Sequence, residues 1–158
     1  ELFNIYRPND FNICTAISDV EKETNLYYYH PKSSINTIDK KTSEYQNAKV
    51  TAIKKIKTNT LNNILNSSKF ESNTIDFLSV DVEGSELAVL KNFNFKKYKP
   101  KVIVIEFLDL TLKKLEIKNI NLKNILNSNI YNLLISNDYN LVNILHSDLV
   151  FIHNDFKD

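Results

Sequence analysis

The stretch Ile75-Asp76-Phe77-Leu78-Ser79-Val80-Asp81-Val82-Glu83-Gly84-Ser85-Glu86 decides the fold. Its apolar first half stops at acidic residues and at the only glycine of the chain, which predicts a buried strand that ends in a turn. Leu87, Leu90 and Phe93 follow at helical spacing and predict a helix. Residues 101–108 are rich in valine and isoleucine and predict a second strand. Strand, helix and strand in this order predict two parallel strands in an α/β fold, with both faces of the sheet covered.

The sequence on either side of this unit predicts further elements. Upstream, we expect three strands and a short helix, at residues 12–18, 24–30, 50–58 and 61–65. The second and third of these strands are expected to pair, and Thr60 is expected to cap the helix. Downstream, we expect one helix and two short closing strands, at residues 120–136, 141–145 and 149–153. No repeat or linker interrupts residues 1–158, so we expect a single domain.

The composition argues against several classes of protein. The 20 basic and 19 acidic side chains leave a net charge of +1, and no block of one sign could follow a phosphate backbone, so we expect no nucleic-acid partner. No apolar stretch is long enough to cross a bilayer, so we expect no membrane span. Cys14 is the only cysteine and is expected to pack inside the strand at residues 12–18. A lone cysteine suits a reducing compartment, and we therefore expect a cytoplasmic protein.

Two further features of the composition predict that the chain is a fragment. It contains no methionine, even at position 1. It also contains one glycine, Gly84, whereas an average usage of about 7% would give roughly eleven. Asparagine is abundant instead, and pairs such as Asn137-Asp138 are expected to form some of the turns.

Acidic residues stand where a parallel sheet binds its ligands, at the carboxyl ends of the strands. Asp81 ends the first strand of the unit and Glu106 nearly ends the second, while Glu83 lies in the turn. We expect these carboxylates to converge on one crevice. An acid at the end of a buried apolar run needs a donor or a cation to offset its desolvation, which favours a functional role for Asp81. Glu86 lies in the first helical turn, where the helix dipole suffices to explain it.

The same residues resemble a known family. The run from Ile75 to Leu90, followed by Tyr98 to Glu106, is similar to the FkbM family of S-adenosylmethionine-dependent methyltransferases. Residues 7–13 and 16–19 resemble the segment that enters the third strand of that family, and residues 57–61 resemble the segment before the fourth. The resemblance is strongest at the Asp-Val-Glu-Gly-Ser-Glu core and its following helix.

The resemblance implies a Rossmann-like class I methyltransferase fold, with a mostly parallel sheet and an antiparallel closing hairpin. Members of the family begin with a strand and a glycine-containing loop that hold the methionine end of the cofactor. Neither is present in residues 1–158, so we expect the C-terminal two-thirds of a domain that is truncated at its N-terminus. Loss of a central strand would expose sheet edges, and association into a homo-oligomer is one expected result.

The implied activity is transfer of a methyl group from S-adenosylmethionine to a hydroxyl of a sugar, a glycan precursor or another small molecule. The resemblance points to Asp81, Glu83 and Glu106 as catalytic residues, and to Ser18, Asp19, Asp81, Val82 and Gly84 as cofactor contacts. Asp81 would act as the base or align the acceptor, and Glu83 would hydrogen-bond it. The absence of a side chain at Gly84 would allow a close backbone approach. Ser18-Asp19 fits a side-chain-capped turn equally well.

Two alternatives stay open. Asp81, Glu83 and Glu106 could instead form an oxygen-rich site for a hard divalent cation in a metal-dependent enzyme. His30, His146 and His153 show no metal-ligand spacing, so we assign them no role and name no metal ligand. The chain could also be a non-catalytic, truncated remnant that either folds as an interaction module or does not fold independently.

Overall fold

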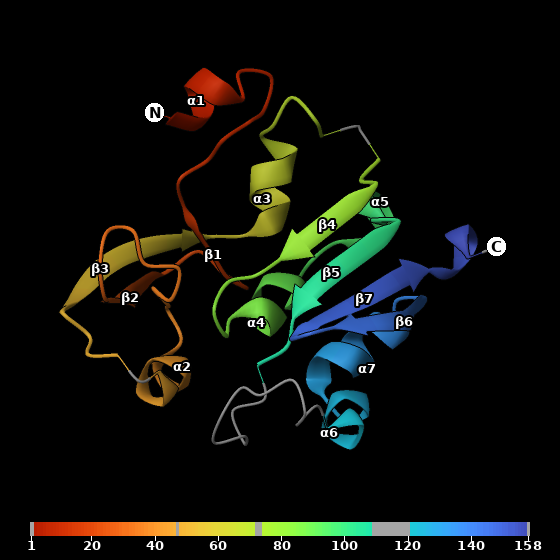
Figure 1. Ribbon diagram of the computed structural model, residues 1–158. Coiled ribbons are helices and arrows are strands. Elements are labelled where there is room, and N and C mark those ends of the chain that lie inside the picture. Colours follow the sequence, from red (N-terminus) through yellow and green to blue (C-terminus); the bar gives the residue numbers. More distant parts are fainter. Residues whose placement is uncertain (1, 47, 72–73, 109–120, 158) are drawn as a thin grey trace.

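The computed structural model describes residues 2–46, 48–71, 74–108 and 121–157 (Figure 1). The elements follow in the order α1 (Leu2–Tyr6), β1 (Ala16–Ile17), β2 (Glu23–Tyr28), α2 (Lys40–Tyr45), β3 (Ala52–Asn59), α3 (Leu61–Asn66), β4 (Phe77–Val80), α4 (Glu86–Lys91), α5 (Phe95–Tyr98), β5 (Val102–Glu106), α6 (Leu122–Leu126), α7 (Asn129–Ile135), β6 (Tyr139–Leu145), β7 (Asp148–His153) and η2 (Asn154–Phe156). Among these residues, no helix has the length and apolar character needed to span a bilayer.

The strands form two separate sheets, of three and four strands, with the orders β1-β3-β2 and β4-β5-β7-β6. In the larger sheet, β4 pairs with β5 in parallel, and β7 lies antiparallel between β5 and β6. In the smaller sheet, β3 pairs with β1 in parallel and with β2 antiparallel. The expected parallel unit and closing hairpin are therefore confirmed. Because both sheets are mixed, a mostly parallel sheet is not confirmed.

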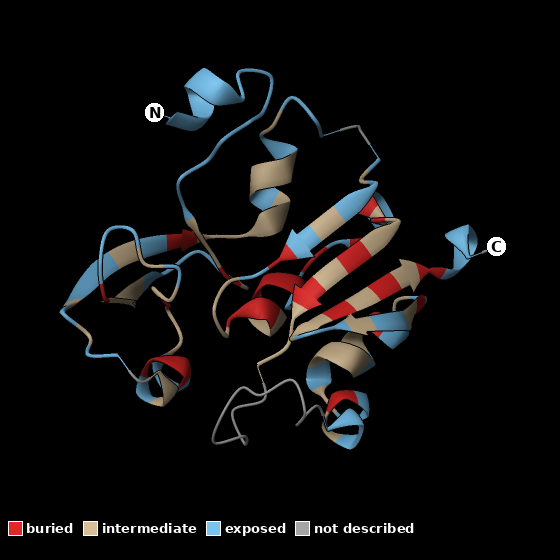
Figure 2. Cartoon of the chain, viewed as in Figure 1, coloured by how far each residue is buried: buried red, intermediate tan, exposed pale blue. Residues whose placement is uncertain are grey.

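The core lies on one face of the larger sheet (Figure 2). On β5, Ile103 and Ile105 are fully buried, and the residues on either side of them are only half-buried. Their partners on β7, Phe151 and Leu149, are buried with them. The helices add buried apolar residues to the same cluster: Val89, Leu90, Phe93, Phe95, Tyr98, Ile125 and Leu134. Burial of each large side chain contributes about 1.5–3 kcal/mol, so this face anchors the β4–β5 unit.

The other face of β4 is open, which corrects the expectation of a sheet covered on both faces. Phe77 is 59% exposed, and Ser79, which points the same way, is exposed too. Leu78 and Val80 point to the opposite face and belong to the core. β4 is also the edge strand of its sheet. This nearly continuous apolar strand thus has only one covered face. Its sequence alone cannot distinguish a strand covered on one face from a strand covered on both.

The expected strand at residues 12–18 is wrong in its extent. Only Ala16 and Ile17 pair with β3, and the amide of Ser18 adds one more hydrogen bond to the carbonyl of Asn59. Cys14 precedes this short pairing and is exposed, so the expectation that it packs in a buried strand is also wrong. An apolar run becomes a buried strand only where a neighbouring strand is available to pair with it.

The helix expected at residues 120–136 is two helices, α6 and α7, within the residues that the structure describes. The break falls at Asn127 and Ser128, and the Ser128 hydroxyl accepts a hydrogen bond from the amide of Tyr131 as the N-cap of α7. Small polar residues compete for backbone hydrogen bonds in this way and end a helix that apolar spacing alone would continue. The cap expected at Thr60 is confirmed, since its hydroxyl accepts from the amide of Asn63.

Asparagine side chains connect the two sheets through α3 and α4. Asn62 donates to the carbonyl of Asn92 and accepts from the amide of Asn94. Asn92 in turn donates to the carbonyl of Asp19, at 3.0 Å. These bonds connect the segment after β1, which contains Asp19, to the helices that follow the acidic turn.

Candidate functional site

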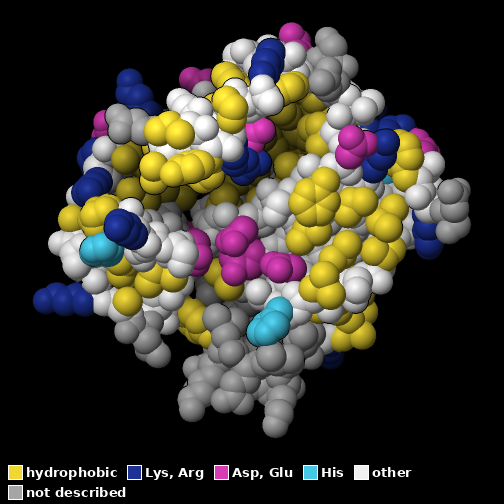
Figure 3. Space-filling model, turned by 45° about the horizontal axis from the view of Figure 1, so that its top comes forward, with side chains coloured by type: hydrophobic (Ala, Val, Ile, Leu, Met, Phe, Trp, Pro, Cys, Tyr) yellow, Lys and Arg dark blue, Asp and Glu magenta, His cyan; other side chains and the backbone are white. Residues whose placement is uncertain are grey.

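Three carboxylates meet at the carboxyl ends of β4 and β5. Val80 lies opposite Ile105 in the parallel register, so the next residues, Asp81 and Glu106, leave the same edge of the sheet. A carboxylate oxygen of each, together with one of Glu86, lies within 4.8 Å of the others. Figure 3 shows acidic side chains gathered in the middle of this face. Asp81 and Glu106 are therefore brought together as expected, but the third member of the cluster is Glu86 and not Glu83.

Glu86 closes the turn between β4 and α4. Its side chain is 3% exposed, and its Oε1 accepts hydrogen bonds from the amides of Val82, at 3.1 Å, and Gly84, at 3.0 Å. The helix dipole alone does not explain a buried carboxylate with two backbone donors. The sequence signal for this role is an acid in the first turn of a helix that can reach back to the free amides before it.

Two residues of the turn have positive φ, Glu83 at 55° and Gly84 at 94°. The side of Gly84 where a Cβ would stand is filled by Thr42 of α2, whose Oγ1 lies 2.0 Å from that position. Thr42 is fully buried, and its hydroxyl has no hydrogen-bond partner among the described residues. Gly84 is therefore needed for packing within the chain itself. Its expected contact with a cofactor stays a prediction.

Glu106 holds a proton at neutral pH. Burial raises its pKa to about 8, and the negative charges of Asp81, Glu83 and Glu86 add to the effect, as does a hydrogen bond with Asp81. Its Oε2 is buried and receives no hydrogen bond from the described residues, which makes the ionised form costly. Burial, and then neighbouring acids, also raise the pKa of Glu83. A buried carboxyl group with acidic neighbours can hold and release a proton near pH 8.

Ser18 and Asp19 interact with each other and with Lys22. Ser18 is buried, and its hydroxyl donates to the Asp19 carboxylate at 3.1 Å. Asp19 also forms an ion pair with Lys22, at 3.7 Å. Among the described residues, no hydrogen bond or ion pair joins this pair to the acidic cluster. These contacts join side chains and cap no backbone amide among the described residues, so the capped turn and the contact with adenine both stay predictions.

Comparison with known families decides the wider assignment. The family model for the methyltransferase FkbM domain matches residues 2–145. The chain belongs to the FkbM methyltransferase family. It is therefore a methyltransferase, and the acidic cluster lies inside the matched residues. No curated protein and no solved structure gives a significant match.

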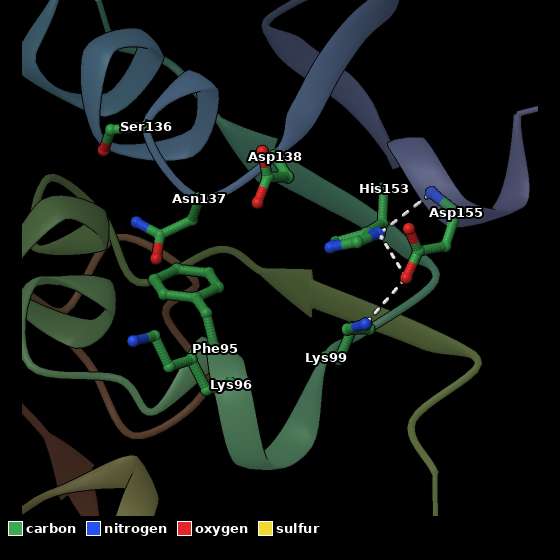
Figure 4. A pocket seen from close by; sticks show the side chains of 8 residues that line it. All are labelled: Phe95, Lys96, Lys99, Ser136, Asn137, Asp138, His153 and Asp155. Carbon is green, nitrogen blue, oxygen red and sulfur yellow. Dashed lines mark hydrogen bonds and ion pairs between the residues drawn. The ribbon is translucent and has the colours of Figure 1, made fainter.

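A cavity of this FkbM domain, of about 340 Å³, lies beside the segment that enters β5 (Figure 4). It is lined by Phe95, Lys96, Lys99, Ser136, Asn137, Asp138, His153 and Asp155. Nδ1 of His153 accepts from the amide of Asp155, and the Asp155 carboxylate is paired with Lys99 at 2.7 Å. Two lysines and two aspartates thus balance one another in the lining, which favours no class of charged ligand.

The close approach of Thr42 predicts a coupled pair of mutations. Gly84→Ala should lower the free energy of unfolding by about 2–4 kcal/mol, because it adds a clash and an unfavourable positive φ. In a Thr42→Ala background the same change should cost less, since Oγ1, the nearest atom, is gone. Chemical denaturation of the four proteins measures this difference. An equal cost of Gly84→Ala in both backgrounds would show that Thr42 does not set the requirement.

The proton on Glu106 predicts how stability depends on pH. Its pKa is about 8 in the folded chain and near 4.5 when unfolded, so the folded chain binds more protons between these values and loses stability as the pH rises through that window. Glu106→Gln should remove this loss and be more stable than the parent at pH 9, with the difference shrinking toward pH 5. Glu44→Gln, at an exposed ion pair on α2, is the control and should keep the parent's slope. Parallel stability curves for Glu106→Gln and the parent would contradict the assignment.

Proposed function

We propose that this FkbM domain transfers a methyl group from S-adenosylmethionine to a hydroxyl of a small-molecule acceptor, such as a sugar or a glycan precursor. The observation that carries the proposal is the cluster of Asp81, Glu86 and Glu106 at adjoining strand ends, with Asp81 exposed at its mouth. Transfer to a hydroxyl needs a base for the hydroxyl proton and groups that align the oxygen. An exposed carboxylate such as Asp81, with a buried acid beside it to orient it, suits both tasks.

The charge of the site fits the cofactor. When bound, S-adenosylmethionine supplies a methyl group on a positively charged sulfur, beside a positively charged amino group. The site gathers the carboxyl groups of Asp81, Glu86 and Glu106, with Glu83 in the adjoining turn, and such a gathering of acidic side chains favours a cation nearby. The amides of Val82 and Gly84 donate to Glu86. The groups of these two residues that could still contact a ligand are their carbonyl oxygens and the half-buried Val82 side chain.

Each acid has a distinct part in this proposal. Asp81 is exposed and takes the acceptor's proton or aligns its hydroxyl. Glu106 keeps its own proton at neutral pH and hydrogen-bonds Asp81, which orients that carboxylate. Glu83 is half-buried beside Asp81 and hydrogen-bonds the acceptor. Glu86 is buried and holds the turn.

The remaining expectations belong to the same proposal. Ser18 and Asp19 would contact the adenine, which requires the hydroxyl of Ser18 to leave its present acceptor. A cytoplasmic location agrees with an exposed lone cysteine, since Cys14 would be open to oxidation in an oxidising compartment.

The test is made on the chain expressed within its complete open reading frame, so that any segments beyond residues 1–158 are present. We expect saturable binding of S-adenosylhomocysteine by calorimetry, and incorporation of labelled methyl into the small-molecule fraction of a cell extract. Asp81→Asn should lower the transfer rate by about 100-fold or more, the size expected for loss of a general base. Asp76→Asn, at the other end of β4 in an exposed ion pair with Lys101, is the matched control and should leave the rate unchanged. Absence of binding would remove the cofactor assignment.

A second candidate function is metal-dependent catalysis, and the spacing of the cluster favours it specifically. Asp81, Glu86 and Glu106 each present an oxygen within 4.8 Å of the others, which suits a hard divalent cation. Bound Mg²⁺ or Mn²⁺ should then raise the melting temperature in proportion to occupancy, and Asp81→Asn should abolish the rise. A melting temperature that does not change with either ion would rule the candidate out.

A further inference from the structure

The hydroxyl of Thr37 reaches the acidic turn from a distant part of the chain. Thr37 is 1% exposed, and its Oγ1 donates to the carbonyl of Glu83 at 2.7 Å. The same oxygen accepts from the amide of Asp39 at 2.9 Å. Because the hydroxyl both donates and accepts, its orientation is fixed. The bond spans 46 residues of sequence and joins the segment after β2 to the turn after β4.

Thr37 is itself held firmly by the smaller sheet. Its amide and carbonyl both pair with Tyr27 of β2, at 3.3 and 2.8 Å. The neighbouring Asn36 accepts from the amide of Tyr29 and donates to the carbonyls of His30 and Ser33. Two positions away, Asp39 caps α2 by accepting from the amide of Thr42. Thr37 therefore links β2 to the turn, through its backbone bonds to Tyr27 and its side-chain bond to Glu83.

The residue that Thr37 contacts is one that needs support. Glu83 has a φ of 55°, a conformation that L-residues with side chains seldom adopt. Glu86 satisfies the amides on either side of Glu83, through Val82 and Gly84, but it cannot satisfy a carbonyl. Thr37 satisfies the carbonyl. Glu86 of α4 thus binds the amides of the turn, and Thr37, from the segment after β2, binds its carbonyl.

We propose that Thr37 is a positioning residue of the acidic site, which fixes the Glu83 carbonyl and thereby the directions in which Asp81 and Glu83 present their carboxylates. It touches neither the proposed cofactor nor the proposed acceptor, and acts through the turn. The catalytic meaning of this inference rests on the proposed methyl transfer, whereas the clamp itself is a property of the folded chain. The two are therefore tested by separate measurements.

The clamp is tested by amide hydrogen exchange, read by NMR on Thr37→Val, Thr37→Ala and Thr37→Ser. Valine keeps the shape of threonine without its hydroxyl, alanine covers the case in which valine disturbs folding, and serine restores the hydroxyl. We expect the amides of Val82 and Gly84 to exchange at least about tenfold faster in the first two variants, with the buried amides of β5 unchanged, and serine to return them to the parent rate. Thr51→Val is the matched control, because that hydroxyl also donates to backbone carbonyls, those of Tyr28 and Tyr29, but not to the turn.

Unchanged exchange at Val82 and Gly84 in folded Thr37→Val or Thr37→Ala would overturn the inference, as would failure of serine to restore protection. The transfer assay adds the catalytic readout. Loss of the hydroxyl should lower kcat by about tenfold and leave the affinity for S-adenosylhomocysteine within about threefold, because a misaligned base affects the reaction more than cofactor binding. If the parent shows no methyl transfer, the exchange result still decides whether the clamp exists, and the proposed function fails separately.

Discussion

The parallel pairing of β4 with β5 is the constraint on which the site depends. It places the carboxyl ends of two strands at one edge, and Asp81 and Glu106 with them. Carboxylates at this separation repel one another when both are charged, and burial increases the repulsion. The site is compatible with folding because Glu106 keeps its proton, with a pKa of about 8. The protonation of Glu106 therefore follows first from its burial and then from the acids that the sheet topology places around it.

The turn that carries these acids has an unfavourable backbone conformation, which contacts from two parts of the chain stabilise. Glu83 and Gly84 both have positive φ. Glu86 takes the amides of the turn and Thr37 takes a carbonyl, while Thr42 packs where a side chain at Gly84 would stand. The core beneath β5 offsets the cost, because it buries large apolar side chains on one face. Strain kept in place by its surroundings is typical of sites that must hold groups ready for chemistry.

Much of this could be read from the sequence, and what could not has a physical explanation. The strand, turn and helix around Asp81 follow from local spacing, and the convergence of Asp81 with Glu106 follows from the rule that parallel strands end at one edge. The sequence does not reveal that Glu86 binds the amides of the turn, because dipole stabilisation and amide capping both favour an acid at this position. Thr37 and Thr42 lie far from the turn in sequence, and only tertiary packing brings them to it. The predicted burial of Cys14 is wrong because it required strand pairing at Cys14, and the pairing begins only at Ala16.

The proton on Glu106 connects the fold to the chemistry, and the most direct test is a titration of the Glu106 carboxyl carbon by NMR in chains with labelled glutamate. We expect a pKa of about 8 for Glu106, and a fall in this value in Asp81→Asn, which removes a neighbouring negative charge and a hydrogen-bond partner. Asp76→Asn, at the far end of β4, should leave it unchanged. A pKa near 4.5 in the parent, or a value that Asp81→Asn does not alter, would contradict the account.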